Sequence, residues 1–179
     1  MTVLQALDRY YDRMAGNGEV PDYGFTYENI SYALCFNSDG SISDLIDLRS
    51  SSSGKPKPRR LMVPRPKRTS NIQSNFLWDK TAYAFGVGKS KRLNREHQEF
   101  ERYHNQLLSE LDSDHARAFL TFVQRWRPER FLQSPFSAEM LDQSFVFCLA
   151  GERSFLHDVP LLRQQWLSAL DEPDAPVGI

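Results

Sequence analysis

Apolar residues recur at spacings of three and four in several stretches of this chain, a pattern typical of amphipathic helices. The first stretch covers residues 2–15, and Gly16 would end it. A second runs from Asn94 to residue 111, and a third follows a capping sequence at residues 112–114. A last stretch follows Pro160. The pattern therefore predicts four helices, and the short turn between the two middle ones predicts an antiparallel pair.

Alternating apolar and polar positions predict a sheet. The run from Ile30 to Phe36 alternates strictly, Asp39-Gly40 is a turn signal, and residues 42–48 would be the returning strand of a hairpin. Residues 61–63 predict a third, short strand, and residues 144–149 predict a further one. We therefore expect an α+β fold, in which a small, mainly antiparallel sheet is packed with several helices and carries long basic loops.

Two polar stretches interrupt these elements. Residues 50–60 combine serine, glycine and Lys-Pro pairs, which favour neither a helix nor a sheet ladder, so we expect an exposed and mobile loop. Residues 67–75 are rich in amide side chains and lead directly into an aromatic block from Phe76 to Phe85. We expect the aromatic block to anchor the polar loop to the core.

The charges are sorted along the chain. Residues 48–95 hold thirteen Lys or Arg and one acid, Asp79, which gives +12, while the remainder sums to −13. The net charge of −1 therefore hides a basic segment within an acidic domain. We expect a single domain over residues 1–170, followed by a linker or chain end at 171–179.

A basic segment of this kind attracts polyanions, although charge runs are often only solvated faces. This one lies inside the domain, mixes arginine with amides and precedes an aromatic block, which favours contact with nucleic acid. The predicted phosphate contacts are Lys55, Lys57, Arg59, Arg60, Arg65, Lys67, Arg68, Lys80, Lys89, Lys91 and Arg92.

Recognition of DNA bases requires side chains other than the lysines and arginines that would contact phosphates. Asn71, Gln73 and Asn75 each offer a donor and an acceptor, and their spacing in an extended loop would turn all three toward one groove. The alternative is that they only solvate the loop. Trp78 and Phe76 would either stack on bases or anchor the loop.

Other chemistries find little support in the sequence. Cys35 and Cys148 both lie in apolar runs, so we expect two small buried thiols and no disulfide. Residues 86–90, GVGKS, end like a phosphate-binding loop, but Tyr83 stands where that loop needs its first glycine. We expect no cofactor and no enzymatic activity.

A histidine trio also invites a metal-site interpretation. His97, Glu101 and His104 would share one face of a helix, as in a metal-dependent nuclease. They lie beside the predicted apolar face, however, and no fourth ligand is evident, so we expect solvated or capping roles. The chain has neither a run of about eighteen apolar residues nor a signal-peptide pattern, which predicts a cytoplasmic protein without membrane contact.

Several stretches of this sequence resemble one protein family. They are LQALDRYYDR, ISYALCFNSDG, PRRLMVPRPKRTSNIQSNFLWDKTAYAFGV and the helical stretch HQEFERYH. These residues resemble the N-terminal part of the large subunit of the type I-C CRISPR Cascade, and the piece ending in NFLWDKTAY is the most specific. The resemblance implies that the chain is the N-terminal domain of a longer subunit.

The resemblance also implies a function. Such subunits recognise the protospacer-adjacent motif on double-stranded target DNA, help to open the duplex beside it, and carry no catalytic site. The implied partners are the 5′ region of the guide RNA, the guide-capping and backbone subunits, and a helicase-nuclease, with phage anti-CRISPR proteins as further candidates. The alternative is a docking module that holds the large subunit to guide RNA and other subunits without reading DNA.

Overall fold

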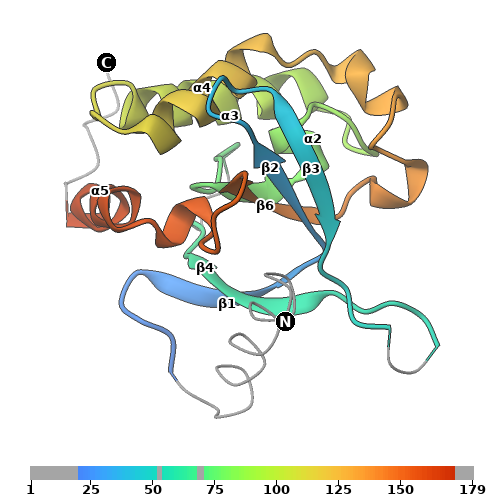
Figure 1. Cartoon of the computed structure of the whole chain (residues 1–179), viewed down its shortest axis with the longest axis horizontal. Coiled ribbons are helices and arrows are strands. Elements are labelled where there is room, and N and C mark those ends of the chain that lie inside the picture. The colour runs from blue at the N-terminus through green and yellow to red at the C-terminus, as the bar shows by residue number, and fades with distance from the viewer. Residues whose placement is uncertain (1–19, 52–53, 68–70, 172–179) are drawn as a thin grey trace.

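The computed structural model describes residues 20–51, 54–67 and 71–171 (Figure 1). The helix predicted over residues 2–15, the side chain of Arg68 and the tail after Asp171 lie outside these ranges. The described part has the predicted α+β architecture, with a small, mainly antiparallel sheet packed with helices. No helix in the described ranges is both long and apolar enough to cross a bilayer.

The central sheet has four strands in the order β3-β2-β6-β5. Strands β2 (Tyr32–Phe36) and β3 (Ile42–Asp47) form the predicted antiparallel hairpin. Strand β6 (Ser144–Leu149) has the predicted bounds and pairs with β2 in parallel. The edge strand β5 (Trp78–Lys80) was not predicted; it pairs antiparallel with β6.

A separate two-stranded ribbon, which was not predicted, lies beside the central sheet. Strand β1 (Phe25–Ile30) pairs antiparallel with β4 (Arg59–Pro64), and neither strand joins the central sheet. The strand expected from Ile30 to Phe36 is therefore two strands, separated at Ser31, whose hydroxyl donates a hydrogen bond to Gln143 Oε1 at 3.0 Å. The strand expected at residues 61–63 begins two residues earlier and includes two arginines.

The ribbon and the helices cover opposite faces of the central sheet (Figure 1). On one face, Leu34 and Phe147 belong to the larger core, together with residues of the helices. On the other face, Ala33 and Val146 pack in a second cluster with Leu61 and other apolar residues of the ribbon. Every residue of β2 is consequently buried, so the alternation in its sequence does not mark a solvent-facing side.

Three helices in the described ranges were predicted, and a short fourth one at Thr81–Ala84 was not. They are α2 (Thr81–Ala84), α3 (Leu93–Leu108), α4 (Asp114–Arg125) and α5 (Pro160–Asp171), with short 3-10 turns at Pro128–Leu132, Ala138–Met140 and Leu156–Asp158. Helices α3 and α4 pack on each other across a short connection, as expected. Ser113 caps α4, because its Oγ accepts a hydrogen bond from the Ala116 N–H at 3.2 Å.

The two cysteines form a disulfide, which contradicts the prediction of free thiols. The parallel register of β2 and β6 places Cys35 directly opposite Cys148, with their Cα atoms 4.6 Å apart. This separation is within the range that a disulfide bridges. The two residues are 113 positions apart in sequence, so the local apolar pattern around each carries no sign of the pairing.

Candidate nucleic-acid interface

The predicted phosphate contacts lie on three parts of the fold and not on one continuous loop. The first part is the β3–β4 connection, the second is β4 with the residues after it, and the third is the end of β5 with the turn before α3. The described members of the set are Lys55 and Lys57 in the first part, Arg59, Arg60, Arg65 and Lys67 in the second, and Lys80, Lys89, Lys91 and Arg92 in the third. All of these are exposed except Arg59, which is half-buried.

The single acid of this basic segment is hidden from solvent. Asp79 is 4% exposed, so residues 48–95 present cations to the outside and no carboxylate. Arg49 is paired with an acid outside the segment, because its Nε and Nη2 donate to the two carboxylate oxygens of Asp47 at 3.0 and 2.9 Å. The surface of the segment is therefore more uniformly cationic than its sequence alone indicates.

The two arginines of β4 differ in how they are held. Arg59 donates from Nε to the Leu48 carbonyl at 2.9 Å, which ties the start of the ribbon to the end of β3. Arg60 is exposed, and its guanidinium lies 4.5 Å from the centre of the Tyr27 ring, within the range of a cation–π contact. Both were expected in a mobile loop; the strand instead fixes their backbone positions.

The three amides do not share one exposed face. Asn71 is exposed, whereas Gln73 and Asn75 are half-buried. Gln73 Oε1 is enclosed, and within the described ranges it has no hydrogen-bond partner. Asn71 and Asn75 are therefore better placed than Gln73 to meet a ligand, and Gln73 would have to turn outward to join them.

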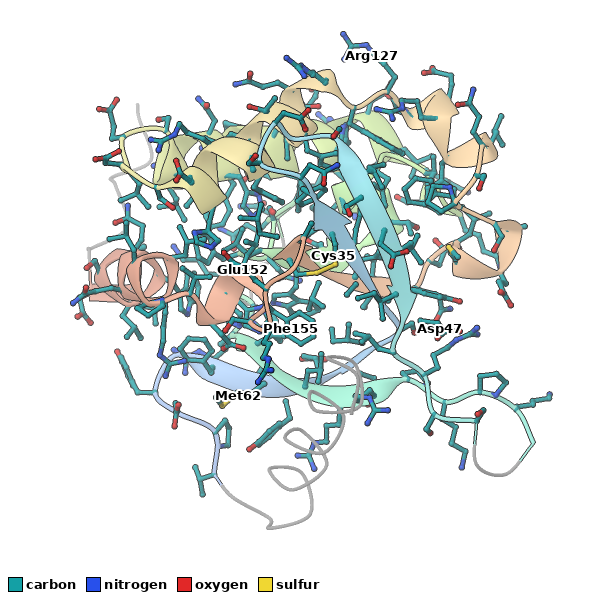
Figure 2. The ribbon with its side chains drawn as sticks, viewed as in Figure 1. Cys35, Asp47, Met62, Arg127, Glu152 and Phe155 are labelled. Atoms are coloured by element: carbon teal, nitrogen blue, oxygen red, sulfur yellow. A yellow bond between two sulfur atoms is a disulfide. The ribbon has the colours of Figure 1, made fainter. Side chains whose placement is uncertain are left out.

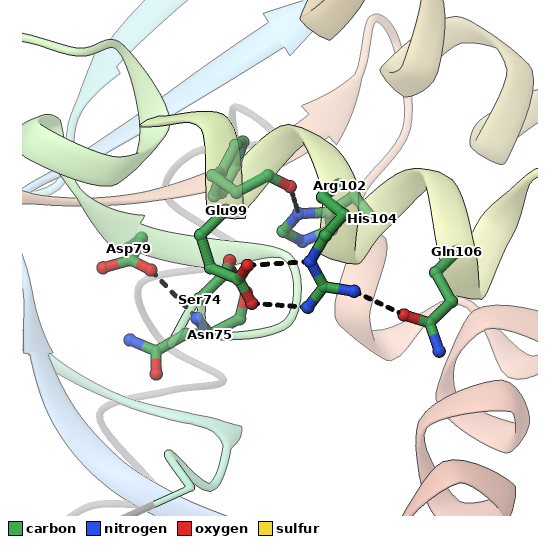
Figure 3. Close-up of polar contacts among 8 residues, drawn as sticks. Ser74, Asn75, Asp79, Glu99, Arg102, His104 and Gln106 are labelled. Atoms are coloured by element: carbon green, nitrogen blue, oxygen red, sulfur yellow. Dashed lines mark hydrogen bonds and ion pairs between the residues drawn. The ribbon is translucent and has the colours of Figure 1, made fainter. Parts of the chain in front are cut away.

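The amide loop is anchored by Asp79, whose carboxylate bonds to the loop backbone at Asn75 (Figure 3). The Asp79 carboxylate accepts hydrogen bonds from the Asn75 N–H at 2.9 Å and from the Lys80 N–H at 2.8 Å. Burial disfavours the ionised form and raises the pKa of Asp79 to about 7, although both hydrogen bonds oppose this change. The last residue of the amide loop is therefore bonded to a carboxyl group that titrates near neutral pH.

A second anchor is His104, which α3 carries into the core. Its Nε2 accepts a hydrogen bond from the Leu77 N–H at 2.9 Å, and Nδ1 donates to the Phe100 carbonyl at 2.8 Å. Leu77 has a positive φ of 60°, a conformation that is rare for a bulky residue and persists only where the surroundings enforce it. Complete burial lowers the pKa of His104 to about 4, so the ring is neutral at pH 7.

The histidines of α3 were expected to have solvated or capping roles, and the structure instead buries both of them. Both ring nitrogens of His104 are engaged with backbone groups, which leaves neither available to a metal ion. His97 is also buried, with Nδ1 2.8 Å from the Tyr83 carbonyl and Nε2 2.9 Å from Glu101 Oε1. In the described ranges there is no group of three or more potential metal ligands.

The aromatic residues after the amide loop are packed inside the domain. Trp78 is 5% exposed and donates from its indole nitrogen to the Pro64 carbonyl at 2.8 Å. Phe76 stacks against the His104 and Trp166 rings, at centroid distances of 5.8 and 5.6 Å. This placement fits the loop-anchor alternative, and in this conformation neither ring offers a face to a base.

The GVGKS stretch does not form a phosphate cradle. The Lys89 N–H donates to Asp142 Oδ1 at 3.1 Å, so a carboxylate occupies the position where a phosphate would have to bind. The Ser90 hydroxyl is bonded to Glu96. Lys89, the lysine of this stretch, is exposed and belongs to the third group of basic residues.

A comparison with protein families decides the class of protein. The family model described as CRISPR-associated protein (Cas_Csd1) matches residues 7–177. The chain belongs to this family. Among curated proteins, no sequence matches it. As a member of the Cas_Csd1 family, the chain is a CRISPR-associated protein of the Cascade type.

The match in this Cas_Csd1 protein extends over the whole candidate interface, including the two anchors that sequence reasoning missed. A signal for each anchor exists in the sequence. His104 lies four residues after Phe100 and four before Leu108, on the apolar stripe of its helix. Asp79 is the one acid in a basic segment, which sets it apart from its neighbours in the sequence.

Proposed function

We propose that this protein is the N-terminal domain of the large subunit of a type I-C CRISPR RNA-guided surveillance complex. In this role it recognises the protospacer-adjacent motif on duplex DNA and helps to start strand opening for antiviral defence. The family assignment supports the complex, and the resemblance of the PRRLMVPRPKRTSNIQSNFLWDKTAY stretch supports the subunit. The proposal includes a cytoplasmic location and no catalytic site.

The observation that carries the proposal is the uniformly cationic surface of residues 48–95. Exposed lysines and arginines on a folded ribbon and two turns provide positive charge at fixed backbone positions, and the only acid is buried. Phosphate contacts of this kind set affinity and register without reading sequence. If about six form, the slope of log K against log salt is about −5.

Motif reading is assigned to the amide loop. Asn71 and Asn75 are the leading candidates, with Gln73 as a third that must reorient, and a side chain beside them would part the first base pair of the target. A good base contact discriminates by about 1–3 kcal/mol, so two or three of them give brief interrogation of many sites. Guide pairing then supplies the specificity for the target, as in other RNA-guided systems.

The proposed partners follow from this division of labour. They are duplex target DNA, the 5′ region of the guide RNA, the guide-capping and backbone subunits, and the helicase-nuclease that cuts the target. Phage anti-CRISPR proteins would compete for the same cationic surface.

The test is duplex binding by the assembled, guide-loaded complex over a range of salt concentrations. Reversing Arg60 and Arg65 to glutamate should flatten the salt slope by about two, because each phosphate contact contributes about one. Arg127→Glu is the matched control, since this exposed arginine lies at the opposite end of the molecule from the ribbon residue Met62 (Figure 2). Asn71→Ala should reduce the preference for the motif and leave the slope unchanged.

Two outcomes would contradict the proposal. A salt slope that stays the same in the double reversal would exclude the ribbon from the DNA path. Preference for RNA over duplex, with indifference to the motif, would instead identify the docking module.

A further inference from the structure

A pocket beside the central sheet has the disulfide in its wall. The cavity measures about 210 Å³, and its lining includes both cysteines with Ile46, Leu48 and Phe155. Charged residues of the lining are Asp44, Glu152 and Arg153. Figure 2 shows the yellow sulfur–sulfur bond beside Cys35, close to Glu152 and Phe155.

The cysteines are nearly buried, yet the pocket gives them an exposed side. Cys35 and Cys148 are 6% and 5% exposed, and both belong to the pocket lining. The volume is several times the roughly 30 Å³ that one water molecule occupies in the liquid, so a small organic molecule fits. A disulfide sealed in the core would offer no such approach.

We propose that the Cys35–Cys148 bond is a thiol–disulfide exchange site that a small-molecule thiol reaches through this pocket. In a reducing cytoplasm, disulfides are rare, and those that persist are mostly redox-active. The inference rests on the pocket, the cysteine pair and the proposed cytoplasmic location, and it holds whether or not the protein reads DNA.

The exchange proceeds in two balanced steps. The thiolate of the small molecule attacks one cysteine sulfur, forms a mixed disulfide with it and releases the other cysteine as a thiolate. A second thiolate then attacks the mixed disulfide, which releases the oxidised small disulfide and the second cysteine thiolate. Two thiols are oxidised in total and one protein disulfide is reduced, with protons taken up from solvent by the cysteine thiolates.

Reduction of the disulfide would lower the stability of the fold. The bond closes a loop of 113 positions between β2 and β6, the parallel pair of the sheet. Opening so long a loop enlarges the conformational freedom of the unfolded chain substantially. We therefore expect reduction to lower Tm by about 10 °C while unfolding stays cooperative.

The test is the rate of reduction by reduced glutathione in the intact protein. Free thiols are trapped with N-ethylmaleimide and counted by mass spectrometry, which is unambiguous because the chain has only two cysteines. Attack through the pocket predicts a rate that is proportional to glutathione thiolate and does not change with urea below the unfolding transition. It also predicts a mixed disulfide with one glutathione during the reaction.

A variant that blocks the pocket tests the route of attack independently. Ser154 lines the pocket, and Ser154→Trp should slow reduction at least tenfold. Ser168→Trp on the exposed side of α5 is the matched control and should react like wild type. A rate that rises with urea in parallel with unfolding would overturn the proposal, as would a Ser154→Trp rate equal to wild type. Two free thiols in protein purified under air would overturn it as well.

Discussion

Two buried titratable groups beneath the amide loop should respond to pH in opposite directions. Asp79 bonds to the Asn75 N–H and His104 to the Leu77 N–H, so both hold the same short segment. Burial disfavours the charged form of each group, so it raises the pKa of Asp79 and lowers the pKa of His104. Acidification should therefore stabilise the fold through one group and destabilise it through the other.

For His104 the folded-state pKa is the lower one. It is about 4 in the folded protein and 6.5 when exposed, so between these values the unfolded chain binds the extra proton. Stability supplied by the neutral ring is present above pH 6.5 and is lost as the pH falls toward 4. At about 1.4 kcal/mol for each pH unit between the two values, the loss is about 3 kcal/mol.

For Asp79 the order is reversed. Its pKa is about 7 in the folded protein and 3.8 when exposed, so between these values the folded chain binds the extra proton. Stability from this proton is fully present below pH 3.8 and is lost as the pH rises through 7. The same conversion gives about 4 kcal/mol. In the wild type the two contributions should largely cancel between pH 4 and 6.5.

Single substitutions separate the two effects in urea unfolding measured at intervals from pH 4.5 to 7.5. His104→Phe keeps an aromatic ring but leaves the Leu77 N–H without its acceptor, at a cost of about 1–3 kcal/mol near neutral pH. Relative to wild type, this variant should regain about 2–3 kcal/mol on acidification to pH 4.5. Asp79→Asn should instead lose about 3 kcal/mol relative to wild type over the same range.

Phe122→Leu serves as the control for lost packing, because this buried ring packs on Phe36 and Phe85 and the substitution involves no titratable group. Its free energy of unfolding should lie below that of wild type by the same amount at every pH. The difference in unfolding free energy from wild type should change with pH in opposite directions for His104→Phe and Asp79→Asn, and a change in the same direction would refute the reasoning. So would two curves that do not depend on pH, since burial would then not have displaced either pKa.

Three further predictions concern backbone contacts. Ser113→Ala should cost about 1 kcal/mol of unfolding free energy, because Ser113 caps α4, and urea unfolding measures it. Trp78→Phe should cost about 1–3 kcal/mol and increase hydrogen exchange in β5, because it leaves the Pro64 carbonyl without its donor. Gly40→Ala should lower Tm more than Gly54→Ala: both have positive φ, but only at Gly40 would a Cβ meet Thr121, at 2.8 Å.

Elements that depend on local signals could be predicted from the sequence. The helix after Ser113, the helix beginning at Pro160 and the strand at Ser144–Leu149 all follow from periodicity and capping within a few residues. The hairpin of β2 and β3 follows from alternation and a turn signal. Each of these elements is determined by residues close together in the chain, and a single sequence shows such local patterns directly.

Features that depend on distant pairing could not be predicted in the same way. The β1–β4 ribbon joins residues 29 to 39 positions apart, from Ile30 with Arg59 to Phe25 with Pro64, and the disulfide joins residues 113 apart. Alternation in β2 suggested one buried face, but the ribbon covers the face that would otherwise meet solvent. The candidate site divides similarly: composition indicated the exposed cations, whereas the buried anchors Asp79 and His104 depend on tertiary contacts.

The anchors explain how a loop rich in amides can be ready for a ligand before it meets one. The Trp78 indole donates a hydrogen bond to the Pro64 carbonyl and so holds the two ends of the intervening loop together. Asp79 and His104 also hold the C-terminal end of the loop, through hydrogen bonds to backbone N–H groups. Ordering a loop costs conformational entropy, and a loop whose ends are clamped by folding loses less of it on binding. Under the proposed function, substitution at Trp78 should therefore weaken motif binding by the assembled complex, although the buried Trp78 ring is not itself a proposed DNA contact.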